Sequence, residues 1–158
     1  MEKATFGAGC FWGVEEIFSN LRGVTHTCVG YMGGNAENPA YQDVCTGKTG
    51  HAEVVQVGFD PSKISFERLA QVFFDSHDPT QINRQGPDTG TQYRSVVFYH
   101  SEPQRETAEE LKAVLEKSGK YKQPVATQIV PAQTFWHAEE YHQKYLEKQG
   151  LSGCHIKT

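Results

Sequence analysis

The first third of the chain alternates between two hydrophobic periodicities. The pattern predicts a short strand near Ala4 to Gly7 and a second strand from Val24 to Tyr31. Between them, apolar residues recur at helical spacing, which predicts a helix that begins close to Cys10 and ends before Gly23; these residues are Val14, Ile17, Phe18 and Leu21. The pattern therefore indicates a strand, a helix and a second strand in this order.

The stretch "HAEVVQVGFD" alternates again and predicts a strand with Glu53, Val55, Val57 and Phe59 on one face. A carboxyl group thus lies on an otherwise apolar face. Between the second and third strands, residues 32–50 form the longest irregular stretch, rich in Gly, Asn and Pro. Long loops in compact domains are often functional.

Four further segments follow the third strand. "SFERLAQVFF" predicts an amphipathic helix that stops before Pro79, and "QYRSVVFYH" predicts a strand. "SEPQRETAEELKAVLEKSG" predicts a helix with a Ser101 and Gln104 capping box and Gly119 past its end. "VATQIV" predicts another strand, and "WHAEEYHQKYLEKQ" predicts the last helix, before the tail "GLSGCHIKT".

Intermixed strands and helices predict an α+β fold, an α/β two-layer sandwich with a mixed sheet of about five strands and about four helices. Some connections are too short for parallel crossovers, which favours α+β. We expect residues 1–158 to form a single domain, because 158 residues suffice for one hydrophobic core and no linker or repeat divides them.

Composition narrows the classes of partner. The chain is 37% hydrophobic with a net charge of -4 and a pI near 6.0. These values give no electrostatic footprint for nucleic acid or membranes, and no apolar run approaches the roughly 18 residues of a membrane span. Because "MEKATFGAG" lacks the apolar core of a signal peptide, we expect a cytoplasmic protein.

Four cysteines, at positions 10, 28, 45 and 154, form no CxxC pair and no disulfide scaffold. Cys10 stands where the first helix begins. A helix N-terminus stabilises a thiolate and lowers its pKa, and Gly7 and Gly9 carry no side chain that would shield the sulfur. The alternative interpretation is an inert core cysteine beside core aromatic rings.

Four blocks of the chain resemble the peptide methionine-S-sulfoxide reductase family, A type. They occur in the family's order: "GCFWGVEEIF", "GHAEVV", "QGPDTGTQYRS" and "AEEYHQKYL". The resemblance implies thiol-dependent reduction of the S epimer of methionine sulfoxide, free or in oxidised proteins, to methionine.

The resemblance also implies catalytic roles. Cys10 is implied as the nucleophile and Glu53 as the proton donor. The predicted apolar face around Glu53 supplies a physical reason, since desolvation raises a carboxyl pKa and keeps the group protonated near neutrality. Without the "GHAE" block, a solvated or salt-bridged carboxylate would be the simpler interpretation.

Substrate-binding roles are implied for five residues. Tyr41 and Tyr93 match the family's two tyrosines that hold the sulfoxide oxygen, and neutral phenols suit this role as donors. Phe11 and Trp12 form an apolar wall for the S-methyl group, because aromatic rings contact sulfur and methyl favourably. Asp88 matches a further site residue, although "GPDTG" is equally typical of a turn.

A second thiol is needed to resolve the sulfenic acid that such a reaction leaves. By the resemblance, Cys154 in the glycine-containing tail, about residues 150–158, forms a disulfide with Cys10 that thioredoxin recycles. Many family members carry two cysteines in this tail, whereas this chain has one, which favours a single exchange. Cys28 and Cys45 match no role, and no cofactor or metal is implied.

Other functions stay open from the residues alone. A redox-sensing thiol protein would form the same disulfide without turning over a substrate. Seven histidines also allow a Cys/His hydrolase, although no hydrolase block is visible. His137 and His142 are five residues apart and miss the HExxH metal spacing, and the scattered cysteines lack the paired spacing of a zinc site.

Overall fold

A computed structural model describes residues 2–35, 37, 39–46, 48–139 and 143 of the chain. Within these residues the main strands are β1 (Glu2–Ala8), β2 (Val24–Met32), β3 (Ala52–Phe59), β6 (Ser95–Tyr99), β7 (Gln128–Pro131) and β8 (Trp136–His137). The helices are α1 (Phe11–Ser19), α2 (Tyr41–Cys45), α3 (Phe66–Asp75) and α4 (Glu102–Ser118). A short hairpin of β4 (Arg84–Gln85) and β5 (Asp88–Thr89) precedes η1, a turn of 3₁₀ helix at Thr91–Tyr93.

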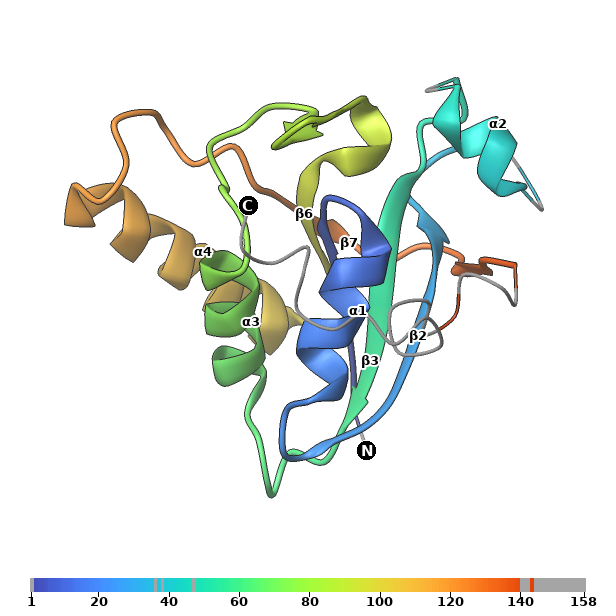
Figure 1. Ribbon diagram of the computed structural model, residues 1–158. Coiled ribbons are helices and arrows are strands. Elements are labelled where there is room, and N and C mark those ends of the chain that lie inside the picture. The colour runs from blue at the N-terminus through green and yellow to red at the C-terminus, as the bar shows by residue number, and fades with distance from the viewer. Residues whose placement is uncertain (1, 36, 38, 47, 140–142, 144–158) are drawn as a thin grey trace.

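The strands form one mixed sheet in the order β7-β6-β1-β3-β2-β8. Pairing is antiparallel between β6 and β1, β1 and β3, β3 and β2, and β2 and β8, whereas β6 and β7 run parallel. Figure 1 shows the helices in front of and beside this sheet. The predicted α+β class is confirmed, with β8 as a strand beyond the five expected.

Two hydrophobic clusters lie on opposite faces of the sheet, as the side-chain alternation of strands requires. The helix-covered face is centred on Phe6 of β1, whose ring stacks on Phe18 of α1 and on Phe66 and Phe73 of α3, with centroids 5.0–5.9 Å apart. The opposite face holds Met32, Ala52, Val54, Val96 and Phe98, against which the segment after β7 packs. Helices α1, α3 and α4 thus share one layer.

The predicted strand "HAEVVQVGFD" matches β3. Its four predicted inward residues are buried, and Val55, Val57 and Phe59 belong to the helix-side cluster. The predictions for α1, α3 and α4 are also confirmed to within a few residues. Ser101 caps α4 by accepting from the Gln104 N–H, and Gly119 ends it at φ 75°.

Only one of the two hydrogen bonds of the predicted capping box is present; the bond from the Ser101 N–H to the Gln104 side chain is not formed. The Gln104 carboxamide accepts the N–H of His100, not that of Ser101, and donates to the Lys3 carbonyl at 2.8 Å. A long-range hydrogen bond between α4 and the start of β1 therefore replaces a local one. The side chain is buried, so its amide group needs partners from both elements.

The helix predicted over "WHAEEYHQKYLEKQ" is wrong at its start. Trp136 and His137 form β8 and pair with Tyr31 and Gly30 at the edge of β2. A Cβ atom on Gly30 would lie 2.3 Å from the Trp136 carbonyl oxygen, so glycine there lets the segment approach as a strand. Residues 140–142 and 144–149 lie outside the described part of the chain.

The region expected to be irregular, residues 32–50, contains α2. This helix has five residues and buries only Val44, so no hydrophobic periodicity announces it. The β4–β5 hairpin was likewise not predicted, because two-residue strands carry no alternation signal.

Candidate functional site

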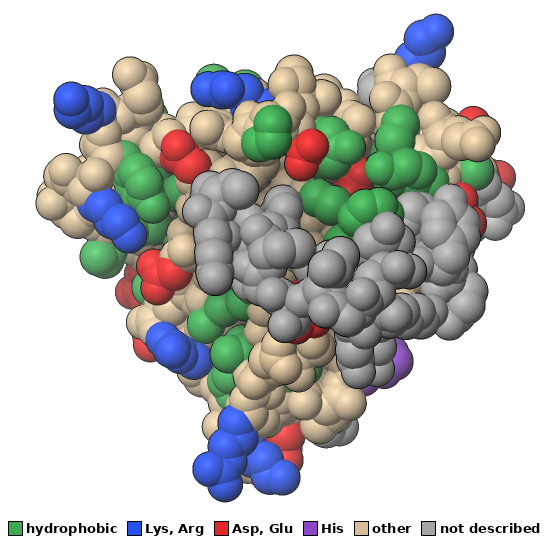
Figure 2. All heavy atoms as spheres, in the orientation of Figure 1, with side chains coloured by type: hydrophobic (Ala, Val, Ile, Leu, Met, Phe, Trp, Pro, Cys, Tyr) green, Lys and Arg blue, Asp and Glu red, His purple; other side chains and the backbone are tan. Residues whose placement is uncertain are grey.

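Most of the predicted site residues meet at one end of the sheet. Because β1 is antiparallel to both neighbours, its C-terminal end lies beside the N-terminal ends of β3 and β6. Cys10 follows β1, Glu53 is the second residue of β3, and Tyr93 lies in η1 just before β6. The loop that leaves β2 at the same end carries α2 and Tyr41. Figure 2 shows hydrophobic and acidic side chains next to one another between the β4–β5 hairpin and α2.

Cys10 is the N-cap residue of α1, in extended conformation with φ -60° and ψ 123°. The backbone N–H groups of Trp12 and Gly13 face its sulfur and lower the thiol pKa, as predicted for a helix N-terminus. Burial raises the pKa more, and the charge of Glu53 adds to it, so the pKa of Cys10 rises to about 12. The predicted net lowering is therefore wrong, because desolvation outweighs the helix.

Gly7 and Gly9 leave space for neighbouring side chains and backbone of the protein rather than for a substrate. A Cβ on Gly7 would meet a Val96 methyl at 2.8 Å and the Glu53 carbonyl oxygen at 3.2 Å. Gly9 has φ +94°, and a Cβ there would lie 2.9 Å from the Gln85 side chain. Gly9 thus provides the left-handed turn from β1 into α1 with the β4–β5 hairpin packed over it.

Glu53 is buried, with a relative exposure of 1%. Its Oε1 accepts the Phe11 N–H at 3.2 Å, whereas its Oε2 is buried without a hydrogen-bond partner among the described residues. Burial raises its pKa to about 8, the Asp88 charge contributes to the rise, and the Phe11 N–H opposes it. Glu53 therefore carries a proton at neutral pH, with one oxygen available for a new contact.

Tyr41 and Tyr93 reach this carboxyl group from two separate segments. Burial raises the pKa of Tyr41 and raises that of Tyr93 to about 12, and the charge of Glu53 raises both. The Tyr41 hydroxyl hydrogen-bonds the Tyr93 hydroxyl and the Cys45 sulfur. Both phenols thus stay neutral and can donate hydrogen bonds near Glu53.

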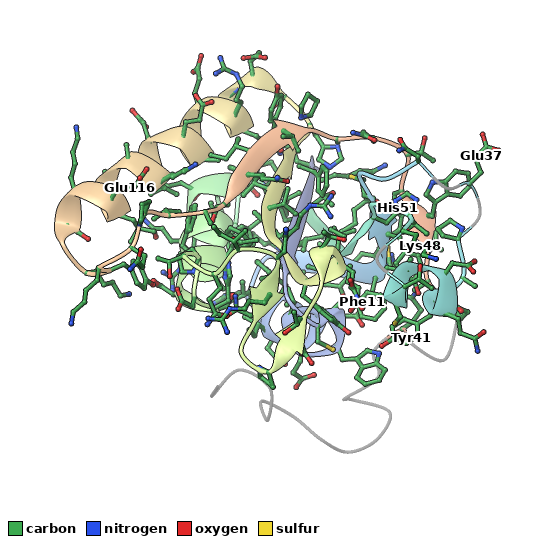
Figure 3. All side chains as sticks on the ribbon, turned by 90° about the horizontal axis from the view of Figure 1, so that it is seen from above. Phe11, Glu37, Tyr41, Lys48, His51 and Glu116 are labelled. Atoms are coloured by element: carbon green, nitrogen blue, oxygen red, sulfur yellow. The ribbon has the colours of Figure 1, made fainter. Side chains whose placement is uncertain are left out.

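Aromatic rings line the site around Phe11. The Phe11 ring is buried, with its centroid 5.8 Å from that of Tyr31 and 6.3 Å from that of Tyr41. Figure 3 shows Phe11 and Tyr41 on the same side of the molecule, from α1 and α2. Trp12 is only half-buried and packs against the core cluster. An apolar wall therefore stands beside the polar group of Glu53 and the two phenols.

Asp88 lies on β5, and its charge raises the pKa of both Cys10 and Glu53. Gly86 and Gly90 take positive φ values in this hairpin, so the turn interpretation of "GPDTG" is confirmed, whereas the substrate-binding role of Asp88 stays a prediction. The hairpin is tied down by Gln85, which accepts the Asp78 N–H at 2.8 Å and donates to the Asp78 carbonyl at 2.9 Å.

The remaining cysteines differ in surroundings. Cys154 lies outside the described residues, so its predicted contact with Cys10 stays a prediction. Cys28 is buried within β2. Cys45 is exposed at the end of α2 and hydrogen-bonded by Tyr41 at the edge of the site, although the sequence assigned it no role.

Two further residues of the site were not predicted. Glu139 accepts hydrogen bonds from the Tyr31 hydroxyl and the Tyr41 N–H, each at 3.1 Å. The block "AEEYHQKYL" contains Glu139, and the alternation in β2 puts Tyr31 on the same face as Val29, so both signals were present. Neither signal predicts contact with α2, because residues 139 and 41 are brought together only by the tertiary structure.

The described residues offer no group of three or more His, Cys, Asp or Glu side chains that could hold a metal ion. The strongest influences on the Cys10 pKa are burial and the Glu53 carboxyl, not a histidine as a Cys/His hydrolase requires. His137 pairs in β8, and His142 lies outside the described residues. None of the helices in the described part is long and apolar enough to cross a membrane.

This arrangement combines a thiol at a helix N-terminus, a protonated buried carboxyl group and two neutral phenols around an apolar wall. Such a set can bind a polar oxygen beside a small apolar group, deliver a proton to the oxygen and attack the atom that bears it.

The chain is similar to known proteins in sequence and in structure. Residues 2–158 match the family model described as peptide methionine sulfoxide reductase. A peptide methionine sulfoxide reductase MsrA of Acidobacterium capsulatum is 60% identical over 156 residues, which cover 99% of this chain and 100% of the relative. The crystal structure of reduced Mxr1 from Saccharomyces cerevisiae matches with a TM-score of 0.88 and 39% identity, covering 94% of this chain and 86% of Mxr1. Mxr1 in complex with Trx2 matches with a TM-score of 0.65 and 28% identity, covering 91% and 84%.

Proposed function

Because the chain belongs to the peptide methionine sulfoxide reductase family, we propose that it reduces the S epimer of methionine sulfoxide, free or within oxidised proteins, to methionine. The observation that carries this proposal is the carboxyl group of Glu53. It is buried and protonated at neutral pH, and its Oε2 lacks a hydrogen-bond partner among the described residues. Burial raises the pKa of Cys10, and Glu53 raises it further when ionised, so the proposed proton donor and nucleophile share one site.

In the first step the oxygen atom moves from the substrate to Cys10. The Cys10 sulfur attacks the sulfoxide sulfur while Glu53 gives its proton to the sulfoxide oxygen. The S–O bond of the substrate breaks and a new S–O bond forms on Cys10. The products are methionine and a Cys10 sulfenic acid, and the thiol proton passes to Glu53, so atoms and electrons balance.

A neutral thiol is the starting state of this step. A pKa of about 12 keeps the Cys10 thiol protonated at rest, and the Trp12 and Gly13 N–H groups stabilise negative charge only as it develops on the sulfur. When Glu53 has delivered its proton to the oxygen, it can accept the thiol proton. Substrate binding and thiolate formation are therefore coupled through one carboxyl group.

Substrate orientation follows from the surroundings of Glu53. Tyr41 and Tyr93 donate hydrogen bonds to the sulfoxide oxygen, whereas Phe11 and Trp12 contact the S-methyl group. Asp88 acts at a distance, because its charge helps to keep Glu53 protonated. Oxygen and methyl then occupy different sides of the site, which supports selection of one sulfur epimer.

Regeneration of the Cys10 thiol completes the catalytic cycle. The Cys10 sulfenic acid condenses with the Cys154 thiol, releasing water and forming a disulfide, and a thioredoxin dithiol reduces that disulfide. The complex of Mxr1 with Trx2 supports a thioredoxin partner.

In this proposal residues 1–158 form one catalytic domain whose tail carries the resolving cysteine. The protein works without a cofactor, in the cytoplasm, where thiols stay reduced.

An epimer-resolved assay tests the function. Reduced protein is mixed with each methionine sulfoxide epimer, methionine is followed by chromatography, and thiols are titrated in parallel. We expect the S epimer to yield methionine as two thiols disappear, and the R epimer to remain. If neither epimer yields methionine while peroxide alone removes two thiols, the chain is a redox-sensing thiol protein.

A further inference from the structure

The Glu139 carboxylate joins two aromatic residues of the site from a remote part of the chain. Its Oε1 accepts the Tyr31 hydroxyl and its Oε2 accepts the Tyr41 backbone N–H, each at 3.1 Å. One side chain therefore couples β2 to the first residue of α2.

Both partners of Glu139 touch the Phe11 ring. Tyr31 is fully buried and its centroid lies 5.8 Å from that of Phe11, and Tyr31 pairs with Glu53 in the sheet register. The Tyr41 centroid lies 6.3 Å from Phe11 on another side. Glu139 thus links β2, which pairs with a strand on each side, to α2, which supplies the Tyr41 hydroxyl.

Helix α2 needs such an anchor. Five residues are too few for a stable isolated helix, and the N-cap residue Ala40 has no side-chain oxygen to accept the N–H groups of the first turn. Asp43 accepts the Ala40 N–H, which leaves the Tyr41 N–H to Glu139. Apart from this hydrogen bond, α2 is held by Val44, the one residue of the helix that is buried in the core.

We infer that Glu139 is a positioning residue that holds the Tyr41 hydroxyl in place for the sulfoxide oxygen by anchoring the first turn of α2 to Tyr31. This inference rests on the proposed function of the site. Glu139 itself does not touch the substrate, and its effect on the reaction passes through Tyr41.

A double-mutant cycle tests this dependence. Glu139→Ala lowers kcat/KM for methionine sulfoxide about tenfold, the cost of one misplaced hydrogen bond. In a Tyr41→Phe background the same substitution has less than about a twofold further effect, because the hydroxyl is already absent. Equal effects in both backgrounds would overturn the inference.

Three other variants distinguish a loss of Tyr41 positioning from a general destabilisation of the fold. Glu139→Gln keeps kcat/KM near that of the parent, because its carbonyl oxygen accepts the Tyr41 N–H while its NH₂ donates to the Tyr31 hydroxyl. Glu109→Ala, which removes a carboxylate bound to Arg105 on α4, has no effect. If Glu139→Ala does not fold, Glu139→Met keeps the side-chain length without acceptor oxygens and serves in the same cycle.

Cys45 reports on Tyr41 without any turnover. Burial raises the pKa of the exposed Cys45 thiol, and the hydrogen bond from the Tyr41 hydroxyl opposes this rise. The pH profile of Cys45 alkylation by iodoacetamide, located by mass spectrometry, therefore shifts to higher pH in Glu139→Ala and in Tyr41→Phe but not in Glu139→Gln. An unshifted profile in Glu139→Ala would overturn the positioning role.

The two readouts distinguish this inference from the proposed function. If the parent protein reduces no sulfoxide while the Cys45 profile shifts as expected, the proposed function fails and Glu139 still holds Tyr41. If the parent is active but neither the cycle nor the Cys45 profile shows coupling, the function stands and the role of Glu139 is refuted.

Discussion

Burial raises the pKa of both Glu53 and Cys10. The pKa of Cys10 rises to about 12 chiefly through burial, and the ionised form of Glu53 adds to the rise. A thiol reacts with oxidants as its anion, so the raised pKa disfavours reaction of Cys10 with peroxide. In the proposed reaction, Cys10 becomes reactive only when a bound sulfoxide accepts the Glu53 proton.

Replacing Glu53 by glutamine tests this pair through pH. Glu53 must carry its proton, so kcat/KM of the parent protein falls as the pH rises through the Glu53 pKa of about 8. Glu53→Gln lowers kcat/KM about 100-fold or more and removes this decline. The measurement is kcat/KM between about pH 6 and about pH 10. A rate that instead increases with pH would mean that ionisation of the free Cys10 thiol limits the reaction.

Asp88→Asn serves as a matched charge variant. The Asp88 charge raises the pKa of Glu53, so its removal moves the decline in kcat/KM to lower pH. An unchanged pH profile of kcat/KM in Asp88→Asn would show that Asp88 does not act on Glu53.

The stability of the protein also depends on protonation of Glu53. Because the pKa of Glu53 is raised in the folded protein, the folded state binds the proton more tightly, and the free energy of unfolding decreases as the pH rises from about 4.5 through about 8.

At the scale of elements, the turn between β1 and α1 determines where the sulfur lies. Gly9 takes φ +94° and lies under Gln85, which the Asp78 backbone holds through two hydrogen bonds. The turn therefore sets Cys10 at the N-terminus of α1 and packs the hairpin that carries Asp88 over it.

Gly9→Ala tests this turn. Alanine at a positive φ costs about 1 kcal/mol or more of stability, and its Cβ also pushes against Gln85. Gly119→Ala is the matched control, because Gly119 also has a positive φ, at 75°, but a Cβ there meets nothing within 4 Å. Both variants lower the free energy of unfolding, measured by denaturant titration, but only Gly9→Ala lowers kcat/KM. Equal kinetics in the two variants would show that the turn does not position Cys10.

At the scale of the whole molecule, the strand order creates the site. With β1 between β6 and β3, residues from positions 10, 53 and 93 arrive at one end of the sheet, and β2 brings α2 to the same end. The proposed cycle adds a requirement on this scale, since Cys154 must reach Cys10 from the tail.

Cys154→Ser tests the relay. Without the resolving thiol, the first step still proceeds, so we expect about one methionine per protein molecule and a sulfenic acid on Cys10 that dimedone traps. The measurement is the methionine burst together with the mass of the dimedone adduct. Steady turnover of this variant with thioredoxin would refute the assignment, and Cys28→Ser, at a buried thiol in β2, should keep steady turnover as a control.

Local sequence patterns were enough to predict the long helices and strands and the two central residues of the site. Side-chain alternation in β3 and helical spacing in α1 depend on local periodicity, and they led to a buried Glu53 and to Cys10 at a helix N-terminus. Four family blocks determined the kind of chemistry, because their order extends over nearly the whole chain.

The other features of the site depend on contacts between segments that are distant in the sequence. The meeting of Tyr41, Tyr93 and Asp88 at Glu53 depends on strand order, which no local pattern encodes. Helix α2 and strand β8 depend on partners about 100 positions away, Glu139 for one and Gly30 for the other. The sign of the Cys10 pKa shift was also undecidable locally, because desolvation by remote segments outweighs the helix N-terminus that the sequence reveals.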